Sequence, residues 1–164
     1  MRKGLITASN FILVCSSTDM TKTGRNLLMD PFPNTCIPHS IEFGRTYKKG
    51  LVLCKDYPCS FLGCSPDGII DCRMCGRLLL EVKCSFKFSF KMSSICVQNN
   101  DGILILKTSH PYYYQHQGQM AVTGMSKCVL VFYTHKGIHC VDIDFNDDFW
   151  KQCRAKLMSF YAHS

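Results

Sequence analysis

Three charged side chains lie in otherwise apolar sequence and have the spacing to act together. Asp67 follows a Ser-Pro pair and precedes a glycine, whereas Glu81 and Lys83 lie two residues apart in the run LLLEVKC. On a β-strand, residues two apart emerge on the same face, so Glu81 and Lys83 should project together while Val82 points the other way. If the two segments pair as a hairpin, Asp67 comes to lie beside Glu81 on the neighbouring strand.

Such a set has the minimum chemistry for metal-assisted hydrolysis of a phosphodiester. Two carboxylates brought close together repel each other unless a cation lies between them, and hard oxygen ligands suit Mg²⁺ or Mn²⁺. A lysine beside the ion can orient an attacking water or neutralise charge on a phosphate. However, aspartate before glycine in a turn and an E-x-K pair on an exposed strand are also common surface patterns, so these three residues alone leave both interpretations open.

The hairpin belongs to a longer series of predicted elements. Alternating or short apolar runs predict strands over residues 51–53, 61–63, 68–71, 78–84, 103–106, 128–134 and 139–145. Capping residues and helical spacing predict helices over residues 7–15, 41–49, 111–124 and 149–161, with loop over 17–37. We therefore expect an α/β (α+β) fold in one domain over residues 1–164, with a central mixed β-sheet flanked by helices and a C-terminal amphipathic helix.

The amino-acid composition indicates which classes of binding partner to expect. The 164 residues include 19 Lys+Arg against 12 Asp+Glu, and the net charge of +7 favours a polyanionic partner such as nucleic acid. No stretch approaches the ~20 apolar residues of a membrane span, so no membrane partner is expected. Polar residues interrupt the first apolar run, which is unlike a signal peptide. We expect an intracellular protein, in the nucleus or cytoplasm, that is not secreted.

The twelve cysteines allow a second kind of site. Cys72 and Cys75 have the spacing of a zinc-binding pair, and Cys59 and Cys64 could complete a set of four. The alternative is a thiol pair at the tip of the hairpin. With a single C-x-x-C and an intracellular location, we expect mostly reduced thiols and do not expect zinc.

The motifs around these residues resemble a known family. FLGCSPDGII followed by LLLEVKC is similar to the core motif of the YqaJ-type viral recombinase nucleases, relatives of bacteriophage lambda exonuclease in the PD-(D/E)xK, or restriction-endonuclease-like, superfamily. RKGLITASNF before it, and HPYYYQHQGQMAVTG and the segment from VLVFY to the last helix after it, continue the resemblance in the family's order. It covers most of the chain and implies a Mg²⁺-dependent exonuclease, with Mn²⁺ as substitute, acting 5′-to-3′ on double-stranded DNA in recombination or repair. Self-association is implied by the resemblance alone.

The resemblance also implies roles for the central residues. Asp67 and Glu81 match the metal ligands, with the backbone carbonyl of Val82 as a third. Lys83 matches the residue that orients or activates the water.

Further roles are implied for a helix and for the start of the chain. Gln115 and Gln119 are four apart and share one helix face, whereas Gln117 points nearly opposite, so only one of these faces can look at the metal. The family pattern favours Gln117 as a catalytic residue, with Gln115 in support at the DNA. Arg2 and Ser9 match the positions that contact the DNA 5′-phosphate.

Two departures from the family pattern keep other functions open. Lys48 stands where the family carries a glutamate near the metal, and the chain is expected to be shortened around residues 48–60 and at its N-terminus. A lysine there would weaken binding of a second cation. The alternative is therefore a catalytically impaired, DNA-binding relic of the same family. A zinc-stapled interaction domain is the third hypothesis.

Overall fold

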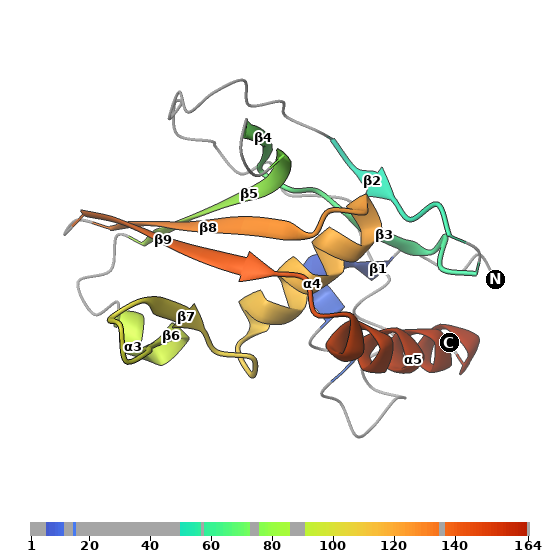
Figure 1. The fold of residues 1–164 in the computed structure, drawn as a ribbon. Coiled ribbons are helices and arrows are strands. Elements are labelled where there is room, and N and C mark those ends of the chain that lie inside the picture. Colours follow the sequence, from blue (N-terminus) through green and yellow to red (C-terminus); the bar gives the residue numbers. More distant parts are fainter. Residues whose placement is uncertain are drawn as a thin grey trace.

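The computed structural model describes residues 6–11, 15, 50–56, 58–72, 76–85, 91–134 and 137–163. Arg2, Lys48, the loop predicted over 17–37 and the helix predicted over 41–49 lie outside these residues. The described part of the chain is a mixed α+β fold with one four-stranded sheet, two smaller sheets and helices beside them (Figure 1).

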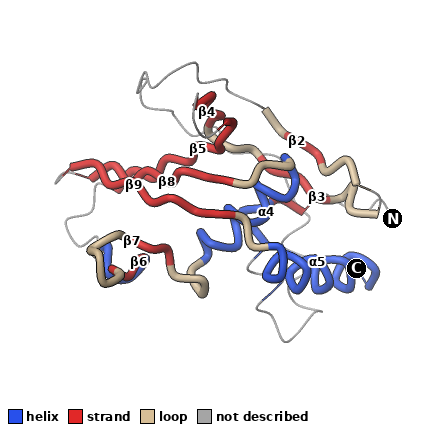
Figure 2. The backbone as a smooth tube through the Cα atoms, in the orientation of Figure 1, coloured by secondary structure: helices blue, strands red, loops and turns tan. Residues whose placement is uncertain are grey.

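The central sheet contains the predicted hairpin. Its strands lie in the order β4 (Gly68–Cys72), β5 (Gly76–Ser85), β8 (Lys127–Thr134) and β9 (Gly137–Asp144). The β4–β5 and β8–β9 pairs are antiparallel and β5–β8 is parallel, so the sheet is mixed as expected. Figure 2 shows its strands in red, apart from the helices in blue. The four strands predicted in these regions are confirmed, with slightly different ends.

Helix α4 (Pro111–Thr123) contributes to the same core. It begins with proline at its first turn, and its N-cap His110 accepts a hydrogen bond from the backbone N–H of Tyr112. It ends at Gly124, whose φ of 70° is the left-handed conformation that a helix C-cap favours. The helix and the sheet share a buried cluster that includes Ile69, Leu79, Tyr113, Met120, Cys128, Leu130, Phe132, Val141 and Ile143.

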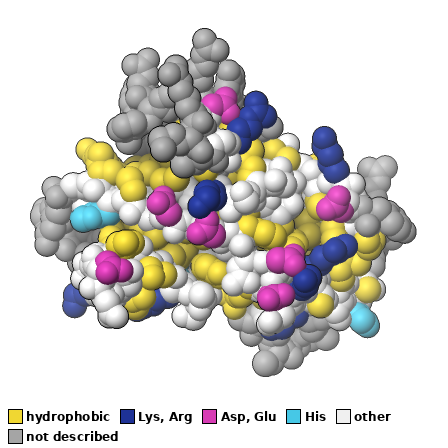
Figure 3. Space-filling view, viewed as in Figure 1, with side chains coloured by type: hydrophobic (Ala, Val, Ile, Leu, Met, Phe, Trp, Pro, Cys, Tyr) yellow, Lys and Arg dark blue, Asp and Glu magenta, His cyan; other side chains and the backbone are white. Residues whose placement is uncertain are grey.

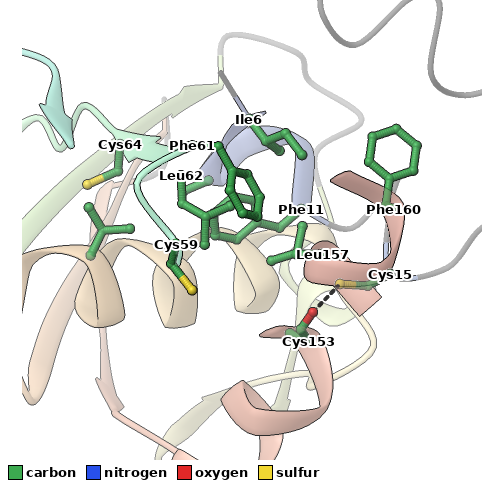
Figure 4. Close-up of a cluster of buried hydrophobic side chains, with 12 residues drawn as sticks. Ile6, Phe11, Cys15, Cys59, Phe61, Leu62, Cys64, Cys153, Leu157 and Phe160 are labelled. Atoms are coloured by element: carbon green, nitrogen blue, oxygen red, sulfur yellow. Dashed lines mark hydrogen bonds between the residues drawn. The ribbon is translucent and has the colours of Figure 1, made fainter. Parts of the chain in front are cut away.

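A second core lies between the N-terminal segment and the C-terminal helix. Strands β1 (Ile6–Thr7), β3 (Leu62–Cys64) and β2 (Val52–Leu53) form a small sheet in that order. Helix α5 (Asp147–His163) lies beside it and buries its apolar stripe, which confirms the amphipathic helix. Figure 4 shows the side chains that meet here, among them Phe11, Phe61, Leu62, Leu157 and Phe160.

The helix predicted over residues 7–15 is only partly correct. Ile6 and Thr7 form a strand that pairs in parallel with β3, and the helical residues begin with the 3-10 turn η1 (Ala8–Asn10). Ile6 is fully buried, and its N–H donates to the Phe61 carbonyl oxygen at 2.8 Å. Pairing to an open strand edge therefore outweighs the helical propensity of this short stretch.

The remaining hairpin lies beside strand β9 of the central sheet (Figure 1). Helix α3 (Met92–Ile95) leads into β6 (Cys96–Gln98), which pairs antiparallel with β7 (Leu104–Leu106). The strand predicted over 103–106 is confirmed, and Gly102 has φ of 78° in the turn before it. Sequence analysis did not predict α3 and β6.

The surface carries charges of both signs. On the face drawn in Figure 3, the described Lys and Arg side chains lie beside Asp and Glu side chains, and the basic charge is not gathered in one area. Among the described residues, no helix combines the length and apolar character needed to span a membrane.

Candidate active site

Strand register brings Asp67 next to Glu81. Gly68, the first residue of β4, pairs with Leu80 of β5, so the next step along both strands sets Asp67 opposite Glu81. The Asp67 carboxylate accepts a hydrogen bond at 2.8 Å from the backbone N–H of Val82. The hairpin thus places an exposed carboxylate beside a buried one, in the arrangement that the sequence predicted.

Glu81 is a buried carboxylate that forms an ion pair with a lysine. Only 4% of the residue is exposed, and its Oε1 accepts a hydrogen bond from the Lys83 Nζ at 2.6 Å. The Lys83 ammonium also lies 5.2 Å from the centroid of the Tyr112 ring, at cation–π distance. A charged group this deep needs several partners, because burial removes its hydration.

Helix α4 supplies the other partners of Glu81. The Gln115 Nε2 donates to Glu81 Oε1 at 2.8 Å, and the Gln119 Nε2 donates to Oε2 at 3.1 Å. The two amides are one helical turn apart and hold the two oxygens of one carboxylate. Sequence analysis recognised their common face but assigned no role to Gln119, although glutamines four apart on a buried helix are a usable signal.

Gln117 lies elsewhere, which corrects its predicted placement at the site. It is fully buried, and its Nε2 donates to the Asp144 carbonyl oxygen at 2.8 Å. Its Oε1 accepts from the Asn146 N–H, also at 2.8 Å. Gln117 therefore joins α4 to the connection between β9 and α5. The geometry gives it no contact with Glu81, because it projects from the opposite side of the helix.

Two buried thiols lie close enough to Glu81 to be affected by its charge. Burial, followed by the nearby charge of Glu81, raises the pKa of Cys64 to about 12. The pKa of Cys128 is raised for the same two reasons. Both thiols are therefore neutral at physiological pH and act as small apolar side chains. The weak local screening strengthens the hydrogen bonds that Glu81 accepts.

His116 is a neutral histidine in this core. It is fully buried, and its Nδ1 contacts the Tyr112 carbonyl oxygen. Burial is the main cause that lowers the His116 pKa to about 4. The charge of Lys83 and the ring of His110 also lower it, whereas Glu81 and the Tyr112 carbonyl raise it.

This burial predicts acid sensitivity. In the unfolded chain His116 takes up a proton below about pH 6.5, but in the folded chain only below about pH 4. The unfolded state then binds more protons between these values, so folded stability falls by roughly 3 kcal/mol as the pH falls through this window. Urea unfolding of the wild type and of His116→Met at a series of pH values measures this. As the pH falls through this window, the free energy of unfolding should fall further in the wild type than in His116→Met. If both free energies depend on pH in the same way, the prediction is wrong.

The donor set around Glu81 fits a divalent cation. A carboxylate has about four acceptor positions. Among the described residues, Lys83, Gln115 and Gln119 donate to three of them, which leaves one on Oε2. Asp67 is exposed, so an ion can reach its carboxylate from solvent. Asp67 and Glu81 both offer carboxylate oxygens, the type of ligand that suits Mg²⁺ or Mn²⁺.

The structure shows fewer contacts for the other candidate residues. Ser9 is exposed in η1, and η1 is in contact with α4. Cys59 and Cys64 are buried, the side chain of Cys72 is not among those described, and Cys75 lies outside the described residues. Within the described ranges, no group of three or more His, Cys, Asp or Glu side chains is placed to hold a metal.

Two solved structures of an alkaline exonuclease (LHK-Exo) from Laribacter hongkongensis have a similar fold. One is 21% identical, with a TM-score of 0.63, over 99% of this chain and 88% of that one. The other, a complex with dAMP, is 20% identical, with a TM-score of 0.65, over 98% and 88%. No curated protein matches the sequence. The likeness establishes the class of fold: this chain has the fold of the alkaline exonuclease structures.

The sequence matches the family model of the YqaJ-like viral recombinase domain over residues 44–126. This range is about half of the chain, and it contains the hairpin with Asp67 and Glu81 as well as α4. The chain belongs to the YqaJ-like viral recombinase family.

Proposed function

We propose that this protein is a divalent-cation-dependent nuclease that hydrolyses the phosphodiester bonds of double-stranded DNA. The observation that carries the proposal is the meeting of Asp67, Glu81 and Lys83 at the β4–β5 hairpin. Membership of the viral recombinase family supports a nuclease of that type. The name of the similar alkaline exonuclease, and its complex with dAMP, support exonuclease action on DNA. We further propose 5′-to-3′ polarity and a role in recombination or repair.

The residues divide the chemistry between them. Asp67, Glu81 and the Val82 carbonyl would hold the cation, Mg²⁺ or in its place Mn²⁺, which supplies electrostatic stabilisation for charge developing on the phosphate. Lys83 has three N–H donors, and its described hydrogen bond to Glu81 uses one of them. A second donor can orient the attacking water or contact a phosphate oxygen. The Tyr112 ring and Glu81 hold the ammonium in place for this task.

DNA contact beyond the reacting phosphate is proposed from sequence position and charge. Ser9 is exposed beside α4, and we propose that it and Arg2 contact the terminal phosphate. The net charge of +7 supports binding to the DNA backbone.

Lys83→Met is expected to lower the rate of DNA digestion by about 10²–10⁴-fold, because it removes the group that positions the water. Lys127→Met is the matched control, since Lys127 also pairs with a carboxylate, Asp144 at 2.7 Å, but its side chain is 51% exposed at the start of β8 and has no described contact with Glu81. It should digest DNA at close to the wild-type rate. Equal rates for the wild type and Lys83→Met would remove Lys83 from the proposed chemistry.

The proposed function is tested by incubating the wild-type protein with linear duplex DNA labelled at the 5′ or the 3′ end. With Mg²⁺ or Mn²⁺, the 5′ label should appear first in mononucleotides, and EDTA should stop the reaction. DNA that is bound in a salt-sensitive manner but stays intact in both ions would instead identify the impaired, DNA-binding relic that Lys48 suggests.

A further inference from the structure

Gln119 holds one specific oxygen of Glu81. Oε1 of Glu81 accepts hydrogen bonds from both Lys83 and Gln115, whereas Oε2 has one described partner, the Gln119 Nε2 at 3.1 Å. Gln119 is 1% exposed, so this contact is shielded from water. The carboxylate can rotate about its last bond unless both oxygens are held. Gln119 is therefore the described side chain that completes its orientation.

Within the described ranges, the oxygen of the Gln119 amide forms no hydrogen bond that would stabilise it in this position. Its Oε1 is buried and has no hydrogen-bond partner among the described residues. Leaving a polar atom buried and unpaired is costly, and an apolar side chain of the same volume would avoid that cost. Turning the amide over would set its oxygen against the Glu81 carboxylate, so the observed orientation is the favourable one. The described contacts of this amide thus serve Glu81 rather than the fold.

Gln117, on the same helix, is an example of a buried glutamine whose hydrogen bonds join parts of the fold. It is also fully buried, but both ends of its amide are paired, with the backbones of Asp144 and Asn146. The two residues therefore differ in the target of their hydrogen bonds while sharing a helix, a residue type and a degree of burial.

We propose that Gln119 is a positioning residue for the cation ligand Glu81. By holding Oε2, it fixes the direction of the one acceptor position that the described donors leave open on this carboxylate. This inference rests on the proposed function, in which Glu81 binds the divalent ion. Groups that orient a metal ligand through a hydrogen bond typically change metal affinity by 10–100-fold when they are removed.

The test is Mn²⁺ binding to the intact chain without DNA, measured as loss of the free-ion signal in electron paramagnetic resonance. Gln119→Met keeps the side-chain length and removes the donor, and it should weaken Mn²⁺ binding about 10–100-fold. Gln119→Asn, which keeps an amide but withdraws it from Oε2, should act in the same direction. Gln117→Met is the matched control and should leave the Mn²⁺ affinity within about twofold of the wild type. Thermal unfolding establishes that each variant is folded.

The outcomes separate the inference from the proposed function. Wild-type affinity in Gln119→Met, or equal losses in the Gln119 and Gln117 variants, overturns the positioning role while leaving the nuclease proposal intact. Glu81→Ala in the same titration tests the nuclease site itself. If that variant binds Mn²⁺ as tightly as the wild type, or if the wild type binds none, both claims fail.

Discussion

Asp67→Ala and Glu81→Ala are each expected to lower Mg²⁺-dependent digestion of duplex DNA by at least about 10³-fold while the protein stays folded. A bound cation supplies several kcal/mol of transition-state stabilisation, and each 1.4 kcal/mol changes a rate tenfold. Each substitution removes one of the two carboxylates that the hairpin register sets side by side. Initial rates of nucleotide release, compared with the wild type at equal Mg²⁺, measure the loss.

The matched control for these variants is Asp71→Ala. Asp71 lies on β4, the strand that follows Asp67. It is exposed, and its carboxylate pairs with the guanidinium of Arg77 at 3.0 Å. Its removal takes one carboxylate from the hairpin without touching the site, so the rate should stay close to that of the wild type. Circular dichroism distinguishes loss of chemistry from loss of structure. Undiminished digestion by either the Asp67 or the Glu81 variant would remove the proposed site.

Gly118→Ala is expected to destabilise the protein by about 1–3 kcal/mol, because the added methyl group would overlap the side chain of Phe11. Phe11 is fully buried and follows η1, so this contact seats the N-terminal segment on α4. For a chain of this size, about 1 kcal/mol lowers the melting temperature by about 2–4 °C. Differential scanning calorimetry of the wild type and the variant measures the shift.

Two further variants identify the cause of this effect. Gly50→Ala adds the same methyl group where, among the described residues other than its chain neighbours, no atom lies within 4 Å, and it should leave the melting temperature nearly unchanged. Phe11→Leu makes room beside Gly118, so the double variant should lose less stability than the sum of the two single changes. Strict additivity would show that the overlap with Phe11 is not the source of the loss.

The sequence predicted the hairpin and its charged residues because their signals are local. The turn residues around Asp67 and the spacing of Glu81 and Lys83 set both register and facing, and β4 and β5 form as expected. The short strand at Ile6 was missed, since a two-residue strand has no detectable period and depends on pairing with a distant partner. The pairing of this segment with a strand far away in the sequence, rather than its local propensity, makes it a strand.

The choice of helix face was the other limit of sequence reasoning. Helix α4 is buried almost all round from His116 to Met120, so its apolar pattern does not show which glutamines face the sheet. Only the packing of α4 against β5 settles that Gln115 and Gln119 face Glu81 while Gln117 faces Asp144. The residues whose hydrogen bonds cross between elements were therefore the least predictable part of the site.

A crystal structure of the protein grown with Mn²⁺ tests the central claim most directly, because the anomalous signal of the ion identifies its position. The account predicts one Mn²⁺ bound between the carboxylates of Asp67 and Glu81, in contact with the Val82 carbonyl, with Lys83 beside it. Saturating Mn²⁺ with no ion between Asp67 and Glu81, or an ion held by other residues, would contradict it.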